Sequence, residues 1–365
     1  MGATVNLASK YHDSLGKVFS HGSFLKGNTN EELQFTGVKT ITVVTDVDVQ
    51  ENDYTRGGTG RYGKVEELGD TIQEFTMTQD KSFTFSIDKG NAADQMNLKK
   101  AGERAKDQYN RVSAPNADKY AFAKYVKYAG KTAGLSAKPT KDTIVEAIDD
   151  ADEYFNEKLV PASERILYIT PEMYKLVRQS GRVTEIESVA KESLTRGMLP
   201  AEIAGFRIVK VPASFFPAGV YFLCTYKRSV LYPWKLEDFK YHSDPPGISG
   251  DLVEERHYFD AFVMGNMCDG VYAGVLSSAK QATPGATCAT PGTSTLTITS
   301  TGASSIYYTL DGSDPRYSKT TAPYTAAIAT TGYKAGDRIV VKAVAYNDSG
   351  FTSDVLETVF TVAGE

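Results

Sequence analysis

The chain has 365 residues, which leaves room for two domains or for one domain with elaborations. Its formal net charge of −5 at pH 7 argues against condensation of nucleic acid by the chain as a whole. Its 41% hydrophobic and 23% charged residues are typical of a globular protein. No run of about 18 apolar residues predicts a membrane span, and the start at Met1 lacks the basic and apolar regions of a signal peptide. Cys224, Cys268 and Cys288 lie far apart, which disfavours a disulfide framework and a zinc site.

The first 90 residues are predicted to form an arm and a ribbon. Residues 1–37 show weak periodicity, and we expect an extended arm with a short helix near 7–18. Apolar and polar residues alternate over 39–49 and again over 71–78 and 83–87, on either side of a glycine-rich turn, which predicts a long hairpin. Because an isolated hairpin is marginally stable in water, this one needs another surface to lie on.

A helical rod is predicted next. Apolar residues repeat at helical spacing over 97–112, and a second helical stretch follows over 118–130. Pro115 is expected to break the rod between them, because proline lacks an N–H group and disfavours helical geometry in the residue before it.

Beyond the rod, helices and strands are intermixed, which predicts an α+β domain that ends near Ser278. Thr140 is a candidate N-cap for a helix that continues to about Leu159, and Pro171 stands in the first turn of another helix. A further helix is expected over 185–195. Strands are expected over 165–169, 203–211, 219–225, 229–234, 239–241 and 256–264.

The composition shifts after Ser278. Residues 279–295 are rich in Ala, Thr, Pro and Gly, which is typical of a linker or a domain boundary. The segments that follow alternate without a helical period, and turn sequences such as Asp311-Gly312 separate them. This pattern predicts a small all-β sandwich of roughly 80 residues.

Two sequences match ligand-binding motifs by letter only. The run from Gly58 to Gly63 reads G-x-G-x-x-G, but charged ribbon flanks it and no helix is expected after it, which favours a hairpin tip over a dinucleotide site. The run from Asp46 begins like a calcium loop, but Glu51 and Gly57 stand where the turn glycine and the bidentate acid belong. His12, His21, His242 and His257 show no metal-ligand spacing. The sequence therefore indicates no enzyme, no cofactor and no metal site.

Charge is distributed unevenly along the chain. Nine bases and three acids over 97–131 give +6, whereas seven acids and three bases over 46–70 give −4. Both stretches can be solvated faces. Alternatively, the acidic ribbon of one subunit docks on basic surface of another, or the basic rod faces a polyanion.

Four segments of the chain resemble the major capsid proteins of tailed bacteriophages. They are the runs over 112–124, 197–209, 227–231 and 245–263, the last of which begins Pro245-Pro246-Gly247-Ile248-Ser249-Gly250-Asp251. The likeness covers about residues 1–278 in order and implies the α+β Hong Kong 97-like fold. The parts that it implies are an N-terminal arm (1–37), an extended loop (38–90), a spine helix region (94–136), an axial domain (137–225) and a return to the peripheral domain (226–278).

This resemblance implies a structural subunit of an icosahedral capsid. Such subunits form hexamers and pentamers that enclose double-stranded DNA, are assembled in the host bacterial cytoplasm with portal and scaffolding proteins, and end up in the virion. The basic side chains that it implies on the DNA-facing side of the spine are Lys99, Lys100, Arg104, Lys106 and Arg111. Those that it implies between subunits on the extended loop are Asp46, Asp48, Glu51, Asp53, Arg56, Arg61, Lys64, Glu66 and Glu67. Some relatives crosslink a loop lysine to an asparagine of a neighbour, for which Lys64 and Asn266 are the candidates.

The C-terminal segment has a resemblance of its own. The run Ile306-Tyr307-Tyr308-Thr309-Leu310-Asp311-Gly312-Ser313-Asp314-Pro315 resembles the immunoglobulin-like domain found at the C-terminus of chitobiase-type glycosidases and on some phage structural proteins. It implies a domain over 279–365 that has no catalytic residues and projects outward from the shell. There, many weak contacts with host-surface glycans would add up through multivalency.

Two alternatives stay open. A secreted carbohydrate-binding or adhesive protein is suggested by the C-terminal domain, although the sequence offers neither a signal peptide nor a catalytic pair of carboxylates. A tail tube or fibre protein of the virion is the second alternative.

Overall fold

The computed structural model describes residues 22–33, 39–46, 53–54, 56–57, 61–62, 70–90, 101–180, 202–334 and 336–363. The chain divides into two compact units that alternate along the sequence. The first unit contains Thr78–Asp118, Trp234–Phe259 and the described residues before Leu25, and the second contains the remainder. The domain boundary near Ser278 remains a prediction.

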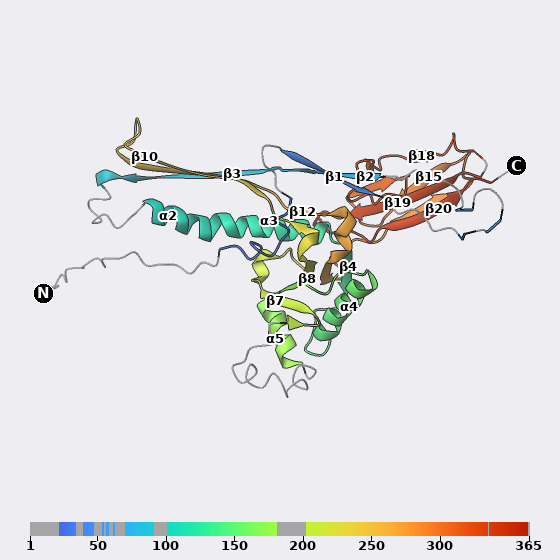
Figure 1. Cartoon of the computed structure of the whole chain (residues 1–365), viewed down its shortest axis with the longest axis horizontal. Coiled ribbons are helices and arrows are strands. Elements are labelled where there is room, and N and C mark those ends of the chain that lie inside the picture. The colour runs from blue at the N-terminus through green and yellow to red at the C-terminus, as the bar shows by residue number, and fades with distance from the viewer. Residues whose placement is uncertain are drawn as a thin grey trace, which may run out of the picture. The chain divides into compact units, whose positions relative to one another are not determined.

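The first unit is an antiparallel sheet with a helix alongside it (Figure 1). The strands are β10 (Trp234–Ser243), β11 (Gly250–Phe259) and β3 (Gln79–Asp88), in this order. Sequence alternation placed 83–87 in the hairpin, but β3 pairs with β11 instead. Trp234 stacks on His257 and Phe259 and contacts Tyr109 of the helical rod, so aromatic packing joins the rod to this sheet.

The helical rod is continuous through the predicted break. It consists of α2 (Ala101–Gln108), the π-helix η1 (Tyr109–Ser113) and α3 (Ala114–Lys127). The Ala114 N–H group donates to the carbonyl of Tyr109, five residues earlier. The prediction that Pro115 ends the first helix is therefore wrong. The wider π-turn takes up an extra residue directly before α3, and the rod continues past Pro115 although its ring nitrogen cannot donate a hydrogen bond.

The second unit contains a six-stranded mixed sheet in the order β4-β13-β8-β5-β7-β6. Its strands are β4 (Lys131–Leu135), β13 (Val271–Leu276), β8 (Val220–Tyr226), β5 (Arg165–Ile169), β7 (Phe206–Lys210) and β6 (Glu202–Ile203). The single strand predicted over 203–211 is in fact a hairpin. Ala204 and Gly205, at φ of 47° and 73°, form the two-residue turn between β6 and β7.

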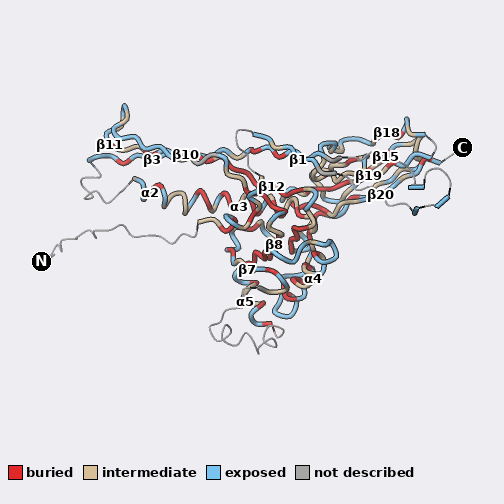
Figure 2. The backbone as a smooth tube through the Cα atoms, viewed as in Figure 1, coloured by how far each residue is buried: buried red, intermediate tan, exposed pale blue. Residues whose placement is uncertain are grey.

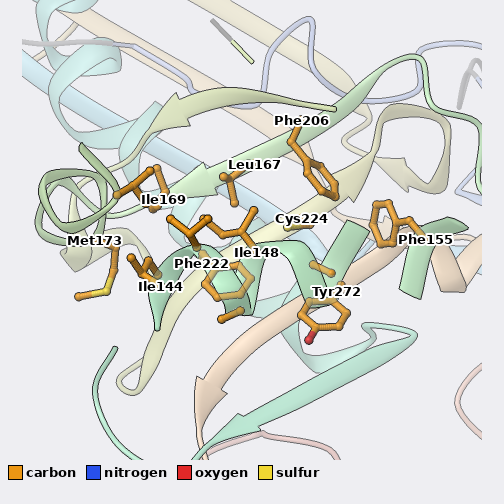
Figure 3. Packing of buried hydrophobic residues seen from close by; sticks show 14 residues of the cluster. Ile144, Ile148, Phe155, Leu167, Ile169, Met173, Phe206, Phe222, Cys224 and Tyr272 are labelled. Atoms are coloured by element: carbon orange, nitrogen blue, oxygen red, sulfur yellow. The ribbon is translucent and has the colours of Figure 1, made fainter. Parts of the chain in front are cut away.

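Helices α4 (Ile144–Glu157) and α5 (Pro171–Gln179) pack on this sheet. Figure 3 shows Ile144, Ile148 and Phe155 of α4 meeting side chains of β5 and β8 in one apolar cluster. Thr170 caps α5 by accepting from the Met173 N–H at 3.3 Å, with Pro171 next to it as expected. The N-cap prediction for Thr140 is wrong, since α4 begins four residues later and the Thr143 hydroxyl accepts from the Thr140 N–H at 2.9 Å.

The second unit also holds a two-stranded ribbon, formed by β1 (Thr40–Asp46) and β2 (Asp70–Thr76). Its shorter elements are η2 (Ala213–Phe215), η3 (Lys227–Ser229), β9 (Val230–Leu231), β12 (Phe262–Val263) and η4 (Gly265–Gly270). The helices predicted near 7–18 and over 185–195 lie outside the described residues.

The C-terminal domain is all β, as predicted. One sheet contains β14 (Gly285–Cys288), β15 (Thr295–Thr299) and β18 (Ile328–Ala329). The other contains β17 (Ala322–Pro323), β16 (Ser305–Thr309), β19 (Arg338–Tyr346) and β20 (Leu356–Thr361). Leu296 and Ile298 from the first sheet share a buried cluster with Ile339 and Val341 from the second.

Candidate assembly surfaces

The ribbon formed by β1 and β2 exposes apolar side chains to water. Val44 and Ile72 lie directly opposite each other across the two strands and are 55% and 39% exposed. Near the base of the ribbon, Phe75 is buried and its ring lies 5.1 Å from that of Phe262. Figure 2 shows this change from buried base to exposed strand. A ribbon of two strands with an exposed apolar pair is suited to packing on another surface.

Four of the residues predicted between subunits are described. Asp46 ends β1, and Asp53, Arg56 and Arg61 lie beyond the ribbon strands. The rings of Tyr54 and Tyr62, next to Asp53 and Arg61, meet edge to face at 5.1 Å, so these two positions are brought together. The remaining residues of the set, Asp48, Glu51, Lys64, Glu66 and Glu67, lie outside the described residues.

The structure describes three of the five residues predicted on the basic face of the spine. Arg104 and Arg111 lie on one stripe of the rod, and both point to the Asp107 carboxylate, at 3.8 and 2.9 Å. Lys106 is about 200° away from Arg104 around a regular helix, and it lines a cavity of about 370 Å³ beside Phe83 and Phe239. Lys99 and Lys100 lie outside the described residues.

Side chains of the C-terminal domain satisfy the end of helix α3. Helix α3 ends at Lys127, whose carbonyl group has no partner within the helix, and Tyr128, Ala129 and Gly130 follow directly. Thr352 Oγ1 donates to the carbonyl of Lys127 at 2.6 Å, and the Tyr317 hydroxyl donates to that of Tyr128. Arg316 Nη1 donates to the next two carbonyls, those of Ala129 at 2.5 Å and Gly130 at 3.3 Å. Four successive carbonyls therefore receive donors from a domain far along the chain.

A turn of the C-terminal domain holds Arg316 in place. The Arg316 side chain is 7% exposed, and its Nη2 lies 2.7 Å from Asp314 Oδ2. The Asp311 carboxylate accepts from the N–H and hydroxyl of Ser313 and from the hydroxyl of Thr320. The run from Asp311 to Pro315, which carries the sequence resemblance, thus orients an arginine toward the helix end.

The same turn also reaches the ribbon and the segment after β12. Lys319 Nζ lies 2.7 Å from Glu74 Oε1 on β2. The Gln73 side chain bridges β2 to that segment, because it accepts from the Gly265 N–H at 2.7 Å and donates to the Val263 carbonyl at 3.2 Å. Tyr317 packs directly over Gly265, where an added Cβ would lie 2.7 Å from the Tyr317 Cβ.

Within the described part of the chain, nothing indicates a metal site or a membrane helix. No group of three or more His, Cys, Asp or Glu side chains among these residues could hold a metal ion. Nor does any described helix have the length and apolar character needed to cross a membrane.

Solved structures resemble most of the chain. A structure from Mycobacterium phage Che8 is 18% identical, with a TM-score of 0.62, over 73% of this chain and 96% of that one. The mature capsid of bacteriophage PhiM1 is 13% identical with a TM-score of 0.60, and the capsid of cyanophage P-SCSP1u is 12% identical with a TM-score of 0.61. Each of these two matches covers 74% of this chain and 92% of the other.

The chain has a phage capsid fold. The resemblance predicted from sequence, including the α+β Hong Kong 97-like class, is thereby confirmed as a fold. The family model described as "Fn3 associated" matches residues 296–360, in agreement with the predicted immunoglobulin-like domain. No curated protein matches the chain.

Sequence reasoning missed the attachment of the C-terminal domain to this capsid fold. The attachment is formed by four polar side chains, of types that in most proteins reach the solvent: Arg316, Tyr317, Lys319 and Thr352. The only local signal is an Arg-Tyr pair directly after the turn that ends at Pro315. The partners of these four residues are 186 to 245 residues away, a separation that no local pattern reveals.

Alkaline pH is expected to destabilise the attachment of the C-terminal domain to the end of helix α3. Burial raises the pKa of Tyr317 well above its ordinary value and also raises the pKa values of Tyr128 and Tyr346. An unfolded tyrosine ionises near pH 10. The stability that these groups contribute is therefore fully present below about pH 10 and is lost as the pH rises through their folded pKa values.

A spectroscopic titration checks this prediction. Phenolate absorbance at 295 nm should rise in two stages, the second coinciding with a change in near-ultraviolet circular dichroism. A single smooth titration near pH 10, with no change in dichroism, would contradict it.

Proposed function

We propose that the chain is a structural subunit of an icosahedral bacteriophage capsid. In this role it forms hexamers and pentamers of one polypeptide, which close into a shell around double-stranded DNA. The proposed location is the virion capsid, assembled in the host bacterial cytoplasm with portal and scaffolding proteins.

The fold match carries this proposal. The chain accounts for 92 to 96% of three phage structures, two of which are described as capsids. The exposed pair Val44 and Ile72 supports it, because such a ribbon is stabilised when it packs on a neighbour. Neither a secreted adhesive protein nor a tail component is favoured by an observation on the described residues.

Electron microscopy of the purified full chain tests the proposal. Negative-stain images, recorded with and without a co-expressed scaffolding protein, are expected to show shells or rings with five-fold and six-fold symmetry. Uniform single subunits under every condition, at high concentration, would rule it out, and tubes would favour the tail-component alternative.

The Arg104 and Arg111 stripe is the proposed contact with packaged DNA. Each phosphate contact by a basic side chain adds about 0.9 to the slope of log affinity against log salt. Replacing both arginines with glutamine should therefore reduce this slope by about 2 in fluorescence anisotropy with a short duplex. Lys106→Gln is the matched control off the stripe, and an unchanged slope in the double variant would remove the assignment.

Two finer proposals concern the partners of the subunit. Binding of host-surface glycans by the C-terminal domain is a proposal that rests on the resemblance of residues 306–315 to a domain of glycosidases and on multivalency in a shell. A crosslink between Lys64 and Asn266 of a neighbour is a proposal that rests on the family resemblance, and Asn266 is exposed.

A further inference from the structure

We propose that the C-terminal domain is an internal clamp, which ties the end of helix α3 to strand β2 of the ribbon. Its function is to hold these two parts in one geometry before a subunit meets its neighbours. The clamp itself is a property of the single chain. Only its consequence for the shell rests on the proposed capsid function.

The chemistry at the helix end supports a clamp. The carbonyl end of a helix carries a partial negative charge, which a cation stabilises. Arg316 brings a buried guanidinium to this end, and Asp314 balances its charge. Since undocking would break the charge-assisted hydrogen bonds from Arg316 to the carbonyls of Ala129 and Gly130, it is opposed at this point.

The clamp is fastened at further points. Lys319 pairs with Glu74 of β2, at a distance of 2.7 Å. Asp354, near Thr352, lies 3.7 Å from Lys131, the first residue of β4, and is held by Lys280 of its own domain at 2.6 Å. Contacts from two separate loops of the domain therefore meet the helix end, the ribbon and the central sheet. A domain that hangs on a linker would make none of these contacts.

The clamp also gives a structural role to the turn from Asp311 to Pro315, which carries the resemblance to the immunoglobulin-like domain. The polar side chains of Asp311, Ser313 and Thr320 bond to one another, and Asp314 bonds to Arg316. These groups orient the clamp and are already satisfied within the protein. This turn is therefore a docking element of the subunit.

The reactivity of the Cys268 thiol depends on whether the C-terminal domain is docked. Burial raises the pKa of its thiol to about 11, although the nearby Arg316 acts to lower it. If Arg316→Met leaves the domain docked, loss of the positive charge makes this thiol react more slowly. If the domain undocks, the thiol becomes exposed and reacts faster. The two outcomes thus have opposite signs.

The test uses the full chain in a Cys288→Ser background, because Cys288 is the other partly exposed cysteine. Arg316→Met is compared with Arg338→Met, the same substitution at an exposed position of the same domain. We expect Arg316→Met to speed maleimide labelling of Cys268 at least ten-fold and to speed amide exchange over 124–130 and 70–76. Arg338→Met should change neither rate.

A second variant keeps the test decisive if Arg316→Met fails to fold. Gly265→Ala disrupts the same contact from outside the C-terminal domain, since its Cβ would lie 2.7 Å from the Tyr317 Cβ. Amide exchange in β5 and β8 should stay slow in both variants, which shows that the central sheet remains folded. The clamp is overturned if both variants keep Cys268 as slow as in the parent, or slower, with no faster exchange at the helix end. This result is independent of whether shells form, so it is separate from the test of the capsid function.

Discussion

Replacing Val44 or Ile72 with aspartate is expected to reduce the yield of assembled shells at least ten-fold, while the subunit still folds. Both side chains are exposed in the single chain, so a carboxylate there leaves the fold intact. In a shell the ribbon would pack on a neighbour, and burial of an unpaired carboxylate costs several times the ~1.4 kcal/mol that corresponds to a ten-fold change in affinity. Because every subunit repeats the contact, the penalty recurs throughout the shell.

Size-exclusion chromatography with electron microscopy measures the yield, and thermal unfolding measures the stability of the subunit. Val359→Asp is the matched control, because Val359 is exposed to a similar extent, 38% against 39% for Ile72, and lies on β20 of the C-terminal domain. This control should assemble normally. Full assembly of Val44→Asp and Ile72→Asp would show that the ribbon does not pack on a neighbour at these positions.

Phe155→Ala is expected to lower the free energy of unfolding by about 3–5 kcal/mol. The side chain is fully buried in the cluster between α4 and the six-stranded sheet. Its ring lies 5.4 Å from that of Phe206, and the Arg165 guanidinium lies over it at 5.5 Å. Truncation removes both ring contacts and leaves a cavity, because the β-sheet on the other side cannot follow.

Urea denaturation followed by tryptophan fluorescence and circular dichroism gives this value. Glu153→Ala serves as the control, since Glu153 is an exposed neighbour on the same helix and should change stability by less than about 0.5 kcal/mol. A loss below about 1 kcal/mol for Phe155→Ala would mean that this site is not a tightly packed core.

Local rules predicted a large part of the fold. Alternation over 39–49 predicted β1, and Thr170 with Pro171 predicted the start of α5. In each case the residues that determine the structure are adjacent in sequence. The all-β character of the C-terminal domain followed in the same way from turns and alternation.

The errors arose where distant or cooperative effects decide the structure. Pro115 breaks an isolated helix, but the rod accommodates it through a π-turn that sequence periodicity does not reveal. The strand β3 alternates like the ribbon, and its pairing with β11 is a choice between distant partners. No local sequence pattern predicted the clamp for the same reason, because Arg316 and Thr352 acquire their partners only when the chain is folded.

The clamp also sets the order in which a nascent subunit can be completed. The end of helix α3 leaves the ribosome long before its partners, since Thr352 lies 225 residues after Lys127. Until Arg316, Tyr317 and Thr352 emerge, the carbonyls of Lys127 to Gly130 depend on water for hydrogen bonds. A chain that stops before Thr352 in translation therefore lacks these donors at the end of helix α3, so each copy acquires its clamp only after this residue has been synthesised.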